Sequence, residues 1–202
     1  MRVKIFVEGG GPSASARTAA ACRKGFRQFF EKVLVDGHNP HIVASGSRDQ
    51  AHEDFRRSLK TDPEVFAILL VDSEDPVSRG KTASEHLRER EKNWNPIPRG
   101  QAHLMVQCME AWFLADKNAL SAYYGTEFKA QALRQNPNIE GIVKKDVLGS
   151  LEAATKEAKS KGKYHKTKHG FDILGNIDPN KVANASPFAK DLINVLRERL
   201  AQ

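Results

Sequence analysis

The chain has 202 residues and a formal net charge of +7. This length suits one domain with a sizeable core. Two cysteines, Cys22 and Cys108, lack the paired spacing of a zinc site or a disulfide framework, so we expect buried thiols in a reducing compartment. No apolar run approaches the length of a membrane span, and we expect no membrane partner. We therefore expect a cytoplasmic protein, whose basic charge favours polyanionic partners.

Strand and helix patterns alternate along the first 125 residues. Residues 2–8 alternate as a strand does, and residues 14–34 carry apolar side chains at three- and four-residue spacing, as an amphipathic helix does. The stretch 65–71 is apolar without alternation, which predicts a central strand buried on both faces. The order predicts an α/β fold with a Rossmann-like central parallel sheet flanked by helices. Further strands are predicted at 41–44 and 103–107, and further helices at 50–59, 81–92 and 110–120.

The remaining sequence predicts a helical C-terminal region. We divide the chain into a core at residues 1–125 and a basic extension at 126–202 that packs on the core. Helices are predicted near 147–159 and at 187–200, with a basic loop between them. Between residues 144 and 170 eight lysines stand against three acidic residues. The excess favours contact with phosphates, although most lysine clusters are solvated loops.

Acidic residues follow two of the predicted strands. Glu8 comes after the first strand, and Asp72 and Glu74 come after the strand at 65–71. The carboxyl ends of neighbouring parallel strands lie side by side, so these three carboxylates can converge in one crevice. Such a group suits a hard cation, Mg²⁺ or Mn²⁺. The alternatives are that Glu8 caps a turn or pairs with Arg48, and that Asp72 caps a turn while Glu74 is solvated.

Three glycines, Gly9, Gly10 and Gly11, follow Glu8. Backbone amides in such a run can approach a phosphate closely. The run lacks the spaced glycines of a dinucleotide fingerprint. The chain also lacks a phosphate-binding Gly-x-x-x-x-Gly-Lys-Ser/Thr motif, which argues against an ATPase, and it lacks the motifs of zinc peptidases and acyl-transfer enzymes.

Glu110 interrupts the apolar stretch 104–114. A carboxylate at this strand-to-helix junction is either a helix N-terminal anchor or a further metal ligand, and the sequence favours neither. Asp116, one and a half turns on, is predicted to lie on the surface.

A glutamate-glycine pair after the first strand and an acid-x-acid pair after a later buried strand resemble the Toprim arrangement of topoisomerases, DnaG-type primases and overcoming-lysogenization-defect nucleases. The whole chain resembles a family of small Toprim-like bacterial proteins of uncharacterised function, often encoded beside an AAA or SMC-like ATPase. This resemblance implies a Toprim-like core and a role in defence against phages. The segments that carry it are residues 7–11, 22–26, 46–48, 70–74, 105–112 and 164–170.

The resemblance also implies a set of site residues. In the related nucleases a further Ser-x-Glu and a late lysine complete a two-metal site. Here residues 108–110 supply Cys-Met-Glu, and Lys166 or Lys168 supplies the lysine. The related nucleases carry a second acid four residues after the first, where this chain has Pro12.

We therefore predict a Mg²⁺- or Mn²⁺-dependent nuclease that cleaves DNA or RNA, works with a neighbouring ATPase and is able to form a homo-oligomer. The alternatives are a catalytically inactive Toprim-like scaffold or sensor that binds the ATPase, and a hydrolase of small phosphate esters. The predicted metal ligands are Asp72, Glu74, Glu110 and Glu8, and Glu8 is also the predicted general base. Lys166 or Lys168 is predicted to offset negative charge in the transition state. The residues predicted to bind the substrate are Gly9, Gly10, Gly11, Arg23, Arg48 and Lys163, and the two arginines could instead brace the carboxylates.

Overall fold

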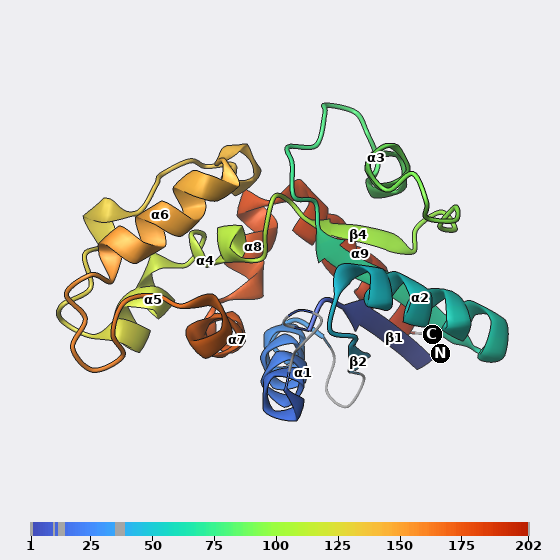
Figure 1. The fold of residues 1–202 in the computed structure, drawn as a ribbon, viewed down its shortest axis with the longest axis horizontal. Coiled ribbons are helices and arrows are strands. Elements are labelled where there is room, and N and C mark those ends of the chain that lie inside the picture. Colours follow the sequence, from blue (N-terminus) through green and yellow to red (C-terminus); the bar gives the residue numbers. More distant parts are fainter. Residues whose placement is uncertain (1, 10, 12–14, 35–38, 202) are drawn as a thin grey trace.

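A parallel β-sheet forms the centre of the protein (Figure 1). The computed structural model describes residues 2–9, 11, 15–34 and 39–201. In these ranges four strands pair in the order β2-β1-β3-β4, all parallel. The predicted α/β fold is thereby confirmed. The strands are β1 (Arg2–Val7), β2 (His41–Ala44), β3 (Val65–Asp72) and β4 (Ala102–Met105).

Helices cover both faces of the sheet. On one face α1 (Ala16–Glu31) and α9 (Pro187–Leu200) pack over side chains such as Ile68 and Leu70 of β3. On the other, α2 (Arg48–Thr61) and α3 (Ala83–Arg90) pack over the alternate side chains, including Leu69. The continuous apolar run of β3 follows from this two-sided burial, and the prediction of a central strand is confirmed.

Side-chain caps fix where these helices begin. The Ser15 hydroxyl accepts the Thr18 N–H at the start of α1, and the Ser47 hydroxyl accepts the Gln50 N–H at the start of α2. Such caps satisfy amides that have no partner within the helix. Residue 14, the predicted start of the first helix, lies outside the described residues.

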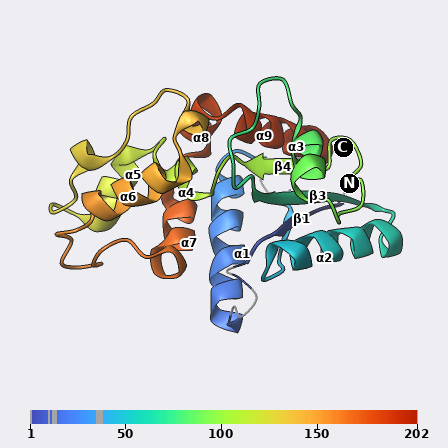
Figure 2. The same cartoon turned by 45° about the horizontal axis from the view of Figure 1, so that its top comes forward.

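A group of helices lies at the end of the sheet toward which the strands point (Figures 1 and 2). One helix predicted at 110–120 is in fact two, because the chain breaks at Asp116, whose side chain accepts the Ala119 N–H. Asp116 is also buried against Lys181 at 2.6 Å, so the prediction that it lies on the surface was wrong. The group comprises α4 (Glu110–Phe113), α5 (Lys117–Tyr124), α6 (Lys144–Ala154), α7 (Lys166–Asn176) and α8 (Pro179–Ala185), with 3₁₀ turns at Ala130–Ala132 and Ile139–Gly141.

The prediction of a basic loop was also wrong, because the second half of that stretch forms the start of helix α7 (Lys166–Asn176). His169, Ile173 and Leu174 of this helix are buried at helical spacing, while Lys168 is exposed. Lys168 therefore lies on the exposed side of an amphipathic helix.

The helices at the end of the sheet share a hydrophobic core with α1. The Phe29 ring stacks on Trp112 with centroids 5.2 Å apart, and Leu151 and Leu174 belong to the same buried cluster. The boundary at residue 125 remains a prediction. No helix within the described part of the chain is long and apolar enough to cross a membrane.

Helices α1 and α7 approach each other closely at Gly25. A Cβ built on Gly25 would lie 2.3 Å from the Phe171 carbonyl oxygen. Only a residue without a side chain permits this contact. The contact holds α7, and with it Lys166, against the core.

We predict that Gly25→Ala lowers the free energy of unfolding by about 1–3 kcal/mol, because the new methyl group forces two helix backbones apart. Gly149→Ala is the matched control. Gly149 is an exposed helical glycine whose Cβ would meet nothing within 4 Å, so alanine there should stabilise the protein by about 0.5–1 kcal/mol. Urea denaturation of both variants provides the measurement, and equal effects of the two substitutions would contradict the assignment.

Candidate active site

Two carboxylates and a lysine meet at the carboxyl ends of β1 and β3. Asp72 is the last residue of β3, and Glu8 directly follows β1. Both line a pocket of about 260 Å³, together with Lys166 from the first turn of α7. The expected meeting of acids at the ends of adjacent parallel strands is thus found for Glu8 and Asp72. The other lining residues are Gly11, Met105, Met109, Thr167 and Phe171.

Asp72 is almost fully buried, with 3% of its surface exposed. Its Oδ1 accepts the Met109 N–H at 2.8 Å, and its Oδ2 lies 3.7 Å from the Lys166 ammonium. Burial raises the pKa of Asp72 to about 7; the ammonium opposes this, and the carboxylates of Glu110 and Glu8 add to it. Near neutral pH the carboxyl group therefore holds a proton for part of the time.

Glu110 is the first residue of α4 and is completely buried. Its Oε1 accepts the Tyr164 hydroxyl at 3.0 Å and lies 3.7 Å from the Lys166 ammonium. Burial, followed by the neighbouring Glu110 charge, raises the pKa of Tyr164, which keeps the phenol a neutral donor. The Oε2 atom of Glu110 has no hydrogen-bond partner among the described residues. A buried carboxylate oxygen of this kind is costly and requires a reason.

Lys166 provides the positive charge between these acids. Burial lowers the pKa of its ammonium, but the carboxylates of Asp72, Glu110 and Glu8 outweigh burial, and the net pKa is raised. Lys168, two residues on, is exposed and forms no ion pair with any described residue. Of the two lysines that the sequence left open, the structure places Lys166 beside the carboxylates.

Glu74 does not join this group. Its carboxylate pairs with the Lys144 ammonium at 2.6 Å, and this pairing outweighs burial and lowers the pKa of Glu74. The strand ends at Asp72, and Glu74 has a left-handed backbone with a φ of 66°. Alternate residues share a direction only while a strand continues, so the acid-x-acid spacing does not bring these two side chains together.

The described glycines after Glu8 pack against the loop that follows β2. The amides of Gly9 and Gly11 both donate to the Gly46 carbonyl at 3.0 Å. A Cβ on Gly9 would lie 2.9 Å from the Cβ of Ala44, so glycine is needed for this close packing. These two amides are engaged within the protein and do not face an anion. The predicted phosphate contact of Gly10 falls outside the described residues.

The predicted basic residues lie in three different places. Arg48 braces the site, since it donates to the main-chain carbonyl of Asp72 and, at 2.8 Å, to the Glu91 carboxylate. Arg23 lines a separate hollow beside β2. Lys163 pairs with Glu152 at 2.5 Å. Among the three, Arg48 alone touches a residue of the acid pocket.

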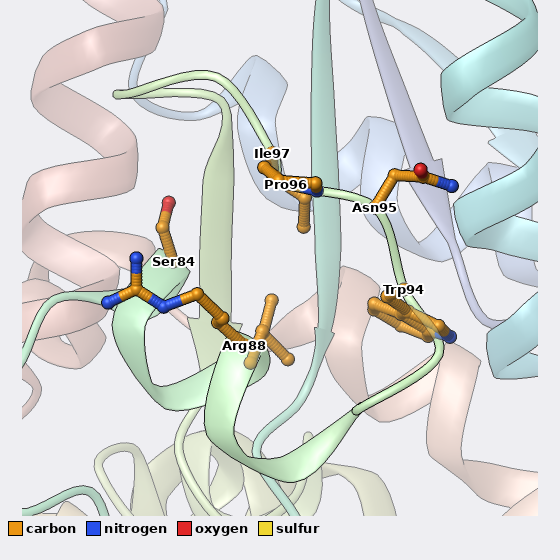
Figure 3. Close-up of a pocket in the computed structure, with 7 residues that line it drawn as sticks. Ser84, Arg88, Trp94, Asn95, Pro96 and Ile97 are labelled. Atoms are coloured by element: carbon orange, nitrogen blue, oxygen red, sulfur yellow. The ribbon is translucent and has the colours of Figure 1, made fainter.

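A second small hollow lies under the loop that follows α3 (Figure 3). Trp94 and Pro96 face Ser84 and Arg88 of α3 across it, and its volume is about 60 Å³. No carboxylate lines this hollow. It offers no alternative to the acid pocket as a metal site.

Hard oxygen donors fit Mg²⁺ or Mn²⁺ at the acid pocket. The Oε2 of Glu110, which has no partner among the described residues, and the Oδ2 of Asp72 are donors of this kind. In the part of the chain that the structure describes, no three His, Cys, Asp or Glu side chains are arranged to hold a metal ion. The predicted cluster of four carboxylates is therefore not assembled here, and Lys166 instead stands between Asp72 and Glu110.

Residues 7–197 match the model of one protein family, described as a domain of unknown function (DUF4276). The chain belongs to this family. No curated protein and no solved structure matches the chain. The family description assigns no activity, so any activity must be argued from the site.

Sequence reasoning missed several groups that hold the site together. They are the Tyr164 hydroxyl on Glu110, the Met109 amide on Asp72 and the Lys144 ammonium on Glu74. The first and third come from residues in the basic stretch, which the sequence assigned to nucleic-acid contact. A buried carboxylate in an apolar run, such as Glu110, needs a hydrogen-bond donor. The one sequence signal for this donor was Tyr164, an aromatic residue with a hydroxyl among the lysines.

The raised pKa of Asp72 predicts a pH-dependent stability. The folded chain binds this proton more tightly than the unfolded chain, in which the carboxyl has its ordinary pKa of 3.8. The resulting stabilisation is complete below about pH 4 and is lost as the pH rises through about 7. Asparagine cannot ionise, so the stability of Asp72→Asn relative to wild type should increase between pH 4 and 8 by an amount on the order of a few kcal/mol.

Urea denaturation across this pH range provides the measurement. The control is Asp75→Asn, an exposed carboxylate paired with Arg90, for which the difference from wild type should stay flat above pH 5. A flat difference for Asp72→Asn as well would show that the folded state does not perturb the Asp72 carboxyl.

Proposed function

We propose that the protein is a nuclease that uses Mg²⁺ or Mn²⁺ to cleave phosphodiester bonds in DNA or RNA. One observation carries the proposal. The buried carboxylates of Asp72 and Glu110 each lie 3.7 Å from one ammonium, at the carboxyl end of a parallel sheet. Buried carboxylates grouped around a lysine beside a pocket, one of them with a raised pKa, are typical of catalytic sites.

Each residue of the pocket has a defined role in this proposal. Asp72 and Glu110 would hold the cation, and Glu8, which also lines the pocket, would be a further ligand or the general base that takes a proton from the attacking water. Lys166 neutralises charge on the phosphate in the transition state. Arg48 fixes the main chain at Asp72. A bound Mg²⁺ or Mn²⁺ supplies Lewis acidity toward the phosphate oxygens.

The charge around the pocket favours a polymer over a small phosphate ester. Thr167 lines the pocket, and Lys168 follows it on the exposed side of α7. Lys145, exposed at the start of α6, adds a further cation in the lysine-rich stretch. Exposed lysines beside a pocket are suited to phosphates on either side of the one that is cleaved.

We extend the proposal to a Toprim-like relationship and to a defence role beside an AAA or SMC-like ATPase. The sequence resemblance supports this extension, and so does the placement of Glu8 and Asp72 at adjacent strand ends. The competing function is a catalytically inactive scaffold or sensor that binds the ATPase. The experiment below separates the two.

Purified protein incubated with Mn²⁺ and labelled single- or double-stranded DNA or RNA, with and without a neighbouring ATPase, should release shortened products. Asp72→Asn and Glu110→Gln should each reduce the cleavage rate at least about 100-fold, because each removes a charged cation ligand. Glu64→Gln, at an exposed position, is the control and should cleave as wild type does. Absence of cleavage by wild type under every condition, together with absence of Mn²⁺ binding, would favour the scaffold.

A substitution of Glu74 tests whether this residue belongs to the metal ligands, as the sequence predicted, or lies outside the site, as in the structure. Its carboxylate is held by Lys144 and does not line the acid pocket, so Glu74→Gln should keep the cleavage rate within about threefold of wild type. If Glu74→Gln reduced the cleavage rate in the same assay as much as Asp72→Asn does, Glu74 would be a metal ligand after all.

A further inference from the structure

One ammonium, which lines the acid pocket, lies beside two buried carboxylates. The Lys166 nitrogen is 3.7 Å from Asp72 Oδ2 and 3.7 Å from Glu110 Oε1, the same distance from each. Both carboxylates are almost entirely buried, whereas the lysine side chain is 49% exposed. The lysine is thus the solvent-accessible member of this group of three charges.

Two other cations near the pocket, Lys144 and Arg48, are already engaged. Lys144 pairs with Glu74 at 2.6 Å, and Arg48 pairs with Glu91 at 2.8 Å. Within the described ranges, Lys166 is therefore the side chain that supplies positive charge directly to Asp72 and Glu110. Two acids held together without it would repel each other in a medium of low dielectric.

We propose that Lys166 is an internal counter-ion that competes with the divalent cation for Asp72 and Glu110. In the metal-free protein its ammonium holds the acid pair together. A divalent cation held by Asp72 and Glu110 would repel the ammonium, which would then be free to reach the phosphate of the substrate. This inference rests on the proposed nuclease function. It gives the Lys166 ammonium two positions, one beside the acid pair and one beside the phosphate of the substrate.

The structure allows the ammonium to move while the carboxylates stay in place. A lysine carries its charge on a flexible stem with several rotatable bonds, and this one lies in the first turn of α7 at the pocket mouth. The groups that orient the acids are fixed. Met109 donates a main-chain N–H to Asp72, and Tyr164, which is buried, donates its hydroxyl to Glu110.

The proposal predicts opposite changes in two measurements on Lys166→Gln. Calorimetric titration with Mn²⁺ alone should show an affinity at least about tenfold tighter than wild type, because a competing positive charge has been removed. Cleavage should fall at least about tenfold, because the phosphate loses its lysine. A residue with a merely structural role would weaken both together.

A third measurement needs no activity. Without Mn²⁺, Lys166→Gln should melt at a lower temperature than wild type, since the acids lose their counter-charge. Saturating Mn²⁺ should raise its melting temperature by more than it raises that of wild type. Lys168→Gln, on the same helix and exposed, is the matched control, and Lys166→Arg keeps the charge; both should bind Mn²⁺ as wild type does.

The outcomes are distinguishable. Tighter Mn²⁺ binding by Lys166→Gln, with Lys168→Gln unchanged, supports the proposal. Unchanged or weaker binding by Lys166→Gln, with wild type still binding and cleaving, overturns the counter-ion role and leaves the nuclease standing. Absence of Mn²⁺ binding and of cleavage in every variant and in wild type overturns the proposed function and the counter-ion role with it.

Discussion

The shared contact of Lys166 with Asp72 and Glu110 joins the sheet to the helices at its end. Asp72 ends β3, Glu110 starts α4, and Lys166 starts α7, so one ammonium links three elements that are far apart in sequence. Burying two carboxylates this deeply is tolerable only when charge and hydrogen bonds compensate for lost hydration. The tight backbone contact at Gly25 supplies the geometry, because it fixes α7 against α1 at the distance where the lysine reaches both acids.

Backbone strain is concentrated at the same edge of the sheet. Glu74 and Gln107 both have left-handed backbones, with φ of 66° and 61°, and they are joined by a hydrogen bond from the Glu74 amide to the Gln107 carbonyl. Such conformations are unfavourable for residues with side chains and persist where the surroundings enforce them. Here the Gln107 side chain also accepts the Lys144 N–H that starts α6. The two strands therefore end in a turn that holds α6 beside the acid pocket.

The sequence predicted the parts of this site that depend on regular geometry. Strand ends converge in any parallel sheet, so Glu8 and Asp72 were placed correctly, and Glu110 was noticed because a carboxylate in an apolar run requires compensation. Glu74 could not be placed, since its direction depends on a turn that spacing does not encode. Helix α7 was mistaken for a loop because three cationic or polar residues at its start concealed the buried stripe that begins at His169. The contacts of Tyr164 with Glu110 and of Lys144 with Glu74 join residues far apart in sequence, so a local sequence pattern carries no information on them.

Orientation and charge balance in the pocket come from different groups. The Met109 amide and the Tyr164 hydroxyl orient the two carboxylates, and neither donor carries a charge. Burial, followed by the neighbouring Glu110 charge, keeps the pKa of Tyr164 above its ordinary value, so this donor is neutral. Lys166 supplies charge from a half-exposed side chain and makes no hydrogen bond short enough to orient either acid. Exchange of one cation for another would thus change the charge of the pocket without disturbing the positions of Asp72 and Glu110. An acid pair that keeps its geometry in this way is preorganised for a cation before the cation arrives.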